Sequence, residues 1–95
     1  MKSKLKSPEL DDLFNAILTL DNLDDCYDFF DDLCTVPELK SFAQRYQVAK
    51  LLLEKKVYSE IVSITGASTA TISRVNRSLS LGCDGYRSVL DKSAK

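Results

Sequence analysis

The stretch from Ser68 to Arg77 combines short hydroxyl side chains with two arginines and contains no acidic residue. Hydroxyl and methyl groups are short enough to let a helix approach the edges of base pairs, and arginine binds guanine or phosphate. A helix face that is merely solvated more often mixes Glu with Lys. The pattern therefore favours DNA binding by residues that we expect to face outward: Ser68, Thr69, Ala70, Thr71, Ser73, Arg74 and Arg77.

Two short helices and a tight turn must hold this face in place. Ile61 and Ile64, with Val62 adjoining them, give a first helix an apolar edge. Gly66 can adopt the positive φ angle that ends such a helix. Residues 58–79 are therefore expected to form a helix-turn-helix, the motif whose second helix enters the major groove of DNA.

The second helix of this motif has an apolar face of its own. Ile72, Val75 and Leu79 recur at intervals of three and four residues, and Ala67 is expected to pack beneath the turn. Ser68 or Thr69 can accept a hydrogen bond from the free N–H groups that begin the helix.

The composition indicates one small soluble domain. The chain has 95 residues, of which 44% are hydrophobic and 28% are charged, and no apolar run approaches the roughly 20 residues that span a membrane. The lysine-containing start of the chain is not followed by the apolar segment of a signal peptide. Three cysteines, an odd number, without such a signal predict reduced thiols and a cytoplasmic protein.

The charge is divided unevenly along the chain. Residues 1–39 have ten acidic side chains against three lysines, a net charge of −7, whereas residues 40–95 have ten basic against four acidic ones, a net charge of +6. The formal net charge of −1 is therefore the sum of a strongly acidic half and a strongly basic half. This separation of charge would orient the C-terminal half towards a polyanion.

Catalysis and metal binding are not indicated. The sequence has no histidine, and no nucleophile–base pair or phosphate-binding loop can be assembled from it. The aspartates between residues 24 and 32 lack the glycine and terminal glutamate of a calcium-binding loop, so a solvated acidic helix face is the better interpretation. We expect neither an enzyme nor a bound cofactor or metal.

Three helices are predicted over residues 8–56. The first begins at Ser7-Pro8 and runs to about Leu20, the second begins near Leu23, and the third follows Thr35-Val36-Pro37. Together they contain more large apolar side chains than one small three-helix body can cover. We therefore expect residues 8–56 to form the core of a homodimer, with these side chains contributing to it: Leu10, Phe14, Ile17, Phe29, Phe30, Phe42, Tyr46 and Leu52.

Residues 80–95 are expected to form a glycine-containing loop, a short C-terminal helix or turn and a polar tail. No alternating strand pattern is present outside the helical periods. The predicted fold is therefore an all-α single domain over residues 1–95, with about six helices.

The segment Gly66–Leu79 closely resembles the Trp repressor family, which has a Gly-Ala…Ala-Thr-Ile-Thr-Arg…Ser-Leu pattern there. The segment 44–53 (QRYQVAKLLL), residues 31–36 and the Gly82…Gly85-Tyr86 tail are similar to the bacterial branch of that family usually called YerC/YecD. The resemblance covers about residues 10–90. It implies an intertwined all-helical homodimer that presents two recognition helices to a palindromic operator.

The resemblance also implies an effector pocket, because the family's repressor binds tryptophan between two arginines beside a glycine. Arg74 matches the arginine of the recognition helix, and Arg45 matches the other if one residue is deleted near Val57; Thr71 and Ser78 match neighbouring positions. Val75 replaces the glycine, and its methyl groups would occupy the space of the ligand. We therefore do not expect tryptophan to be a corepressor.

These observations predict a sequence-specific, DNA-binding transcriptional regulator, acting as a repressor. The alternative is a helical module that uses its helix-turn-helix to dock protein or RNA. Salt-dependent retention on duplex DNA distinguishes the two, because phosphate contacts weaken with salt.

Overall fold

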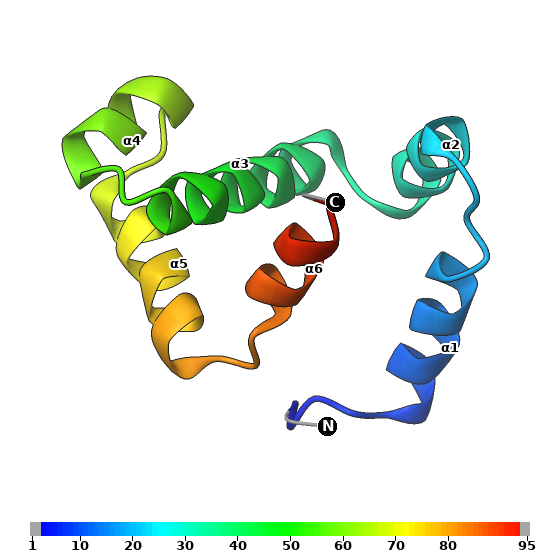
Figure 1. Ribbon diagram of the computed structural model, residues 1–95. Helices are drawn as coiled ribbons and strands as arrows, with labels where there is room; N and C mark the ends of the chain where they lie inside the picture. Colours follow the sequence, from blue (N-terminus) through cyan, green and yellow to red (C-terminus); the bar gives the residue numbers. More distant parts are fainter. Residues whose placement is uncertain (1–2, 94–95) are drawn as a thin grey trace. The chain divides into compact units, whose positions relative to one another are not determined.

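The computed structural model describes residues 3–93, which form six α-helices and no strand (Figure 1). This confirms the predicted all-α class. In chain order the helices are α1 (Pro8–Ile17), α2 (Leu23–Leu33), α3 (Val36–Leu53), α4 (Tyr58–Thr65), α5 (Thr69–Leu81) and α6 (Gly85–Ser93).

The contacts divide the chain into two units, Met1–Leu39 and Lys40–Lys95. The boundary lies inside α3 and coincides with the change in the sign of the charge along the sequence. The first unit is therefore the acidic one and the second the basic one. The prediction of a single domain with a dimerisation core over residues 8–56 stays a prediction.

Side-chain caps begin the helices of the first unit. The hydroxyl of Ser7 accepts a hydrogen bond from the N–H of Leu10 (3.1 Å), and Asn22 Oδ1 accepts one from the N–H of Asp25 (2.8 Å). Each bond satisfies an N–H group that has no partner within its helix. The sequence therefore located both starts correctly, at Ser7-Pro8 and near Leu23.

The predicted end of the first helix at about Leu20 is wrong, since α1 ends at Ile17. The N–H groups of Thr19 and Leu20 bond to carbonyls three residues back, at 3.1 and 3.0 Å. Such bonds tighten the chain into a turn instead of continuing the α-helix. The apolar pattern continues through this turn, and for that reason it did not reveal the end of the helix.

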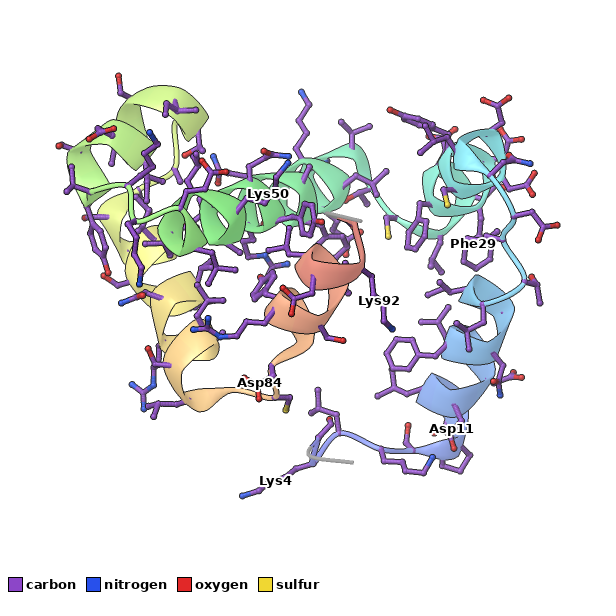
Figure 2. All side chains as sticks on the ribbon, in the orientation of Figure 1. Lys4, Asp11, Phe29, Lys50, Asp84 and Lys92 are labelled. Carbon is purple, nitrogen blue, oxygen red and sulfur yellow. The ribbon has the colours of Figure 1, made fainter. Side chains whose placement is uncertain are left out.

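Helices α1 and α2 are amphipathic but contain no buried residue. Phe29, which projects from α2 in Figure 2, makes an edge-to-face contact with Phe30 at a ring-centre distance of 5.5 Å. Several large apolar side chains of this unit nevertheless remain exposed: Phe14, Leu18, Leu23, Tyr27 and Leu33. Within this chain the apolar faces of the two helices are thus largely uncovered.

A reciprocal capping box begins α3. The N–H of Thr35 donates to Glu38 Oε1 (2.8 Å), and the N–H of Glu38 donates to Thr35 Oγ1 (3.3 Å). These contacts hold the pKa of Glu38 below its ordinary value. The hydrogen bond from the backbone of Thr35 has the larger effect on this pKa, and the hydrogen bond with the Thr35 side chain has the smaller one. Thr35 therefore caps α3, at the start signal Thr35-Val36-Pro37 that the sequence indicates.

Replacing Thr35 with Val should raise the pKa of Glu38 part of the way to its ordinary value, because the hydroxyl is removed and the backbone donor remains. A lowered pKa in the folded state means that the capping box stabilises α3 above the pKa of the unfolded chain. That stabilisation is lost as the pH falls through the folded pKa. An NMR titration of the Glu38 carboxyl measures the shift. Thr19→Val serves as a control that should leave the pKa of Glu38 unchanged.

The buried core lies in the second unit. Helix α3 contributes Val48 and Ala49 and α4 contributes Ile61, all three with no exposed surface. Ala67 lies beneath the turn between α4 and α5, as predicted, with 1% of its surface exposed. The predicted face of α5 completes the core with Ile72, Val75 and Leu79. This core therefore fixes α4 and α5 against α3 (Figure 1).

The second unit closes with a loop and α6. A Cβ atom on Gly82 would lie 2.4 Å from the carbonyl oxygen of Ser78, so only glycine fits where α5 ends. Asp84, in the loop between α5 and α6 (Figure 2), has a φ of 61°. Of the short helix or turn expected here, the structure shows a helix, α6, which ends at Ser93. Residues 94–95 of the predicted tail lie outside the described residues.

Candidate nucleic-acid interface

Helix α4 supports the interface with one buried side chain. Ile61 has no exposed surface, whereas Ile64 is 62% exposed and Val62 is 36% exposed. Of the two residues predicted to form the apolar edge of this helix, Ile61 is therefore buried and Ile64 is exposed. Helix α4 has only eight residues and buries only Ile61 in the core. The other buried side chains of the helix-turn-helix are Ala67 and those of the apolar face of α5.

The turn between α4 and α5 is fixed by backbone geometry and by one hydroxyl. Gly66 has a φ of 72°, a conformation that costs an L side chain roughly 1–2 kcal/mol, and its N–H donates to the carbonyl of Val62 (2.8 Å). Thr65 Oγ1 donates to the carbonyl of Ile61 (2.7 Å) and accepts from the N–H of Ala67 (3.1 Å). The turn therefore has a defined conformation, as the predicted role of Gly66 requires.

Helix α5 begins on the hydroxyl of Ser68, which accepts from the N–H of Thr71 at 3.1 Å. Ser68 Oγ also lies within 3.1 Å of Thr71 Oγ1. The structure thus selects Ser68 over Thr69 as the cap. This leaves the side chain of Thr69 free to face outward at the first position of the helix.

The structure leaves the predicted DNA-facing residues on the open side of α5. Six of the seven are exposed: Ser68, Thr69, Ala70, Ser73, Arg74 and Arg77. The seventh, Thr71, is partly buried, and its hydroxyl accepts a hydrogen bond from that of Ser68. Neither Arg74 nor Arg77 forms an ion pair or hydrogen bond with any residue between 3 and 93. Both guanidinium groups are therefore available to an external acceptor.

The residues of the predicted effector pocket come from two helices, Arg45 from α3 and the other three from α5. The guanidinium of Arg45 lies 5.1 Å from the centre of the Phe42 ring, and its buried Nε has no hydrogen-bond partner among residues 3–93. Arg74 and Ser78 are exposed on α5. Val75 is 1% exposed within the core, so its methyl groups fill space that a glycine would leave open.

One apolar hollow of about 580 Å³ lies near the end of α5. Of the four predicted pocket residues, Ser78 borders it, together with side chains of α3 and α6 that include Tyr46, Tyr86 and Val89. No pattern in the sequence indicates this hollow, because its walls come from three separate elements.

The polar contact that joins α3 to the turn is also absent from the sequence-based predictions. Gln44 Nε2 on α3 donates to the carbonyl oxygen of Thr65 at 3.2 Å, across 21 positions of sequence. No local sequence pattern predicts a hydrogen bond between residues so far apart. In the sequence, Gln44 stands out only as part of the segment that resembles the Trp repressor family.

Comparison with known proteins identifies the family. The model of the Trp repressor protein family matches residues 8–94. The chain belongs to the Trp repressor family. It is 56% identical over 89 residues, which cover 94% of this chain and 86% of the relative, to the uncharacterized protein YerC of Bacillus subtilis (strain 168).

Two solved structures share the fold. One comes from Staphylococcus aureus and is described as a candidate Trp repressor; it is 55% identical, covers 96% of this chain and 91% of its own, and has a TM-score of 0.92. The other is a TrpR-like protein from Eubacterium eligens ATCC 27750, 54% identical, covering 96% and 94% of the two chains, also with a TM-score of 0.92. The resemblance seen in the sequence to the YerC branch is thereby confirmed.

Membership in the Trp repressor family places the chain among helix-turn-helix transcription regulators rather than enzymes. Among residues 3–93, no helix has both the length and the apolar character needed to cross a membrane. The same residues contain no cluster of three or more acidic or thiol side chains arranged to hold a metal ion.

Proposed function

We propose that this Trp repressor family member is a sequence-specific DNA-binding regulator that works in the cytoplasm as a repressor, by occupying a palindromic operator as a homodimer. The observation that supports this most strongly is the open face of α5. It combines hydroxyls, no acid and two arginines that have no partner among residues 3–93, on a helix whose other face is fixed in the core. Such a helix can enter the major groove without losing its own packing.

Within this proposal the side chains of α5 have two kinds of role. Arg74 and Arg77 supply most of the electrostatic contact, and Ser68, Thr69, Ala70 and Ser73 face the bases. Thr71 supports the start of the helix through Ser68. The polarity of charge agrees with this assignment, because the unit that contains α5 has a net charge of +6.

Selection from random duplexes tests the proposed function directly. The tagged protein should enrich a palindromic sequence, and substitutions at Thr69 or Ser73 should change which sequence is enriched. Each base contact that a substitution removes is worth roughly 1–3 kcal/mol of discrimination. If no sequence is enriched, specific recognition is wrong, and the docking of protein or RNA on the helix-turn-helix becomes the better hypothesis.

Replacing Arg77 with Ala should weaken binding to every duplex, whatever its sequence, because a phosphate contact does not depend on the base. The plot of log affinity against log salt should become shallower by about one unit for each phosphate that the variant no longer binds. Affinity measured across a series of salt concentrations gives this slope. Lys92→Ala removes the same charge from α6 and should leave the slope close to that of the wild type.

A homodimer would cover the apolar faces that α1 and α2 leave open. Neither helix has a buried residue, and Phe14 and Phe42 from the predicted dimer core are 54% and 45% exposed in the single chain. Exposure of such large apolar side chains to water is unfavourable. A second copy of the chain supplies complementary apolar surface, as a two-fold interface requires.

The dimer makes stability depend on protein concentration. We expect the melting temperature to rise with concentration over a hundredfold range, because association favours the folded state by mass action. Thermal unfolding followed by circular dichroism, together with sedimentation equilibrium, measures this. A monomer at low micromolar concentration with a constant melting temperature would exclude the dimer.

A further inference from the structure

The carbonyl of Thr65 finds its hydrogen-bond donor outside the helix-turn-helix. Thr65 is the last residue of α4, and the final carbonyls of a helix have no partner within it. Gln44 Nε2 reaches this carbonyl from α3 at 3.2 Å, in a partly buried position. The bond therefore ties the end of α4 to the helix that contributes Val48 and Ala49 to the core.

From this anchor a series of hydrogen bonds continues to the first turn of α5. The hydroxyl of Thr65 accepts from the N–H of Ala67, and Ser68, the next residue, accepts from the N–H of Thr71. Only the left-handed Gly66 and the buried Ala67 separate the anchored carbonyl from the cap of the recognition helix. A shift of the Thr65 carbonyl would therefore move the residues that begin α5.

The apolar core and this bond constrain α5 in different ways. Burial of Ile72, Val75 and Leu79 is favourable but has little directional preference, so it tolerates small rotations of a helix. A hydrogen bond weakens steeply with angle, so it defines an orientation. Among residues 3–93, Gln44 is the α3 side chain that makes such a directional contact with the turn.

We propose that Gln44 is a positioning residue for sequence recognition: without touching DNA, it sets the angle at which α3 presents the recognition helix. This inference rests on the proposed function. Base contacts require accurate placement of short side chains such as Thr69 and Ser73, whereas long arginine side chains can follow a phosphate that has moved. Removal of the anchor should therefore weaken specific binding and leave non-specific binding almost unchanged.

Three variants test the role of Gln44. Gln44→Met keeps the length of the side chain and removes the donor, and Gln44→Glu keeps its shape but places a carboxylate against the carbonyl of Thr65. Gln47→Met is the matched control, since Gln47 is an exposed glutamine on the same helix. Circular dichroism and thermal melting establish that each variant folds, and Gln44→Glu replaces Gln44→Met in the comparison if the latter does not.

Affinity is then measured at one salt concentration for the duplex enriched by the wild type and for a scrambled duplex. Gln44→Met should bind the enriched duplex about three- to tenfold more weakly, the loss expected for one net hydrogen bond of about 1 kcal/mol. Its affinity for the scrambled duplex and its salt slope should match those of the wild type and of Gln47→Met. Equal losses on both duplexes, or no loss on either, would overturn the proposal.

Amide hydrogen exchange provides a readout that does not need DNA. The N–H groups of Gly66 and Ala67 should exchange faster in Gln44→Met than in Gln47→Met, because the turn is no longer anchored. Unchanged exchange would contradict the anchoring. If the wild type enriches no sequence, the proposed function fails and the effect on recognition fails with it, whereas faster exchange would still establish the anchor itself.

Discussion

The substitution Ile72→Ala should lower the free energy of unfolding by about 2–5 kcal/mol, the range for an isoleucine that loses its buried atoms and leaves a cavity. Ile72 has no exposed surface and lies among Ile61, Val75 and Leu79, in the core that joins the two helices of the helix-turn-helix. Small proteins are stable by only about 5–15 kcal/mol. The change should therefore remove a large part of the total stability.

Chemical denaturation followed by circular dichroism measures the effect at Ile72. Ser73→Ala, at the next position of α5, is the control: Ser73 is exposed, so the stability of this variant should stay within about 0.5 kcal/mol of the wild type. We further expect Ile72→Ala to bind DNA only at temperatures at which the variant is still folded. A decrease below about 1 kcal/mol would mean that the core does not hold α5 in the way described.

The second large effect concerns tryptophan, which we expect this protein to bind weakly or not at all. The resemblance to the Trp repressor family implies a glycine beside the ligand, and Val75 stands at that position. The structure gives Val75 an exposed fraction of 1%, with its methyl groups in the core beside Ile72 and Leu79. An indole could enter only if the helix moved. Overpacking of this kind costs about 1–3 kcal/mol, roughly a tenfold to hundredfold loss of affinity.

Calorimetry with millimolar tryptophan, combined with DNA binding measured with and without it, decides the matter. We expect no heat of binding in the submillimolar range and the same affinity for DNA in both conditions. Arg74 is exposed and unpaired among residues 3–93, which leaves it free to contact DNA directly without a corepressor. Submillimolar binding that also tightens the DNA complex would show that the pocket persists despite Val75.

Local patterns in the sequence were sufficient to place most of the helix-turn-helix. Gly66 adopts the expected positive φ, Ser68 caps α5, and the intervals between Ile72, Val75 and Leu79 identify the buried face. Each of these features depends on residues within one or two helical turns of one another. The chemistry of the adjoining residues is therefore enough to determine them.

The same patterns failed where burial depends on distant parts of the chain. Ile64 was predicted to share an apolar edge with Ile61 but is exposed, because the short α4 buries only Ile61 against the rest of the second unit. The end of α1 was predicted at about Leu20 instead of Ile17 because the apolar spacing continues into the following turn. The N–H groups of Thr19 and Leu20 in that turn bond to carbonyls three residues back, so the α-helix has already ended.

The sequence by itself determined the all-α class, the two-part charge distribution, the family resemblance and the residues of the α5 face. Periodicity, capping and charge are local properties, so they can be recognised in the sequence without knowing which helix packs against which. Only the tertiary structure decided that Gln44 donates a hydrogen bond to the carbonyl of Thr65, and that Tyr46, Ser78 and Tyr86 border one hollow. These contacts join residues of α3, the helix-turn-helix and α6 that are far apart in the sequence, and which side chains meet there depends on how the helices pack against one another.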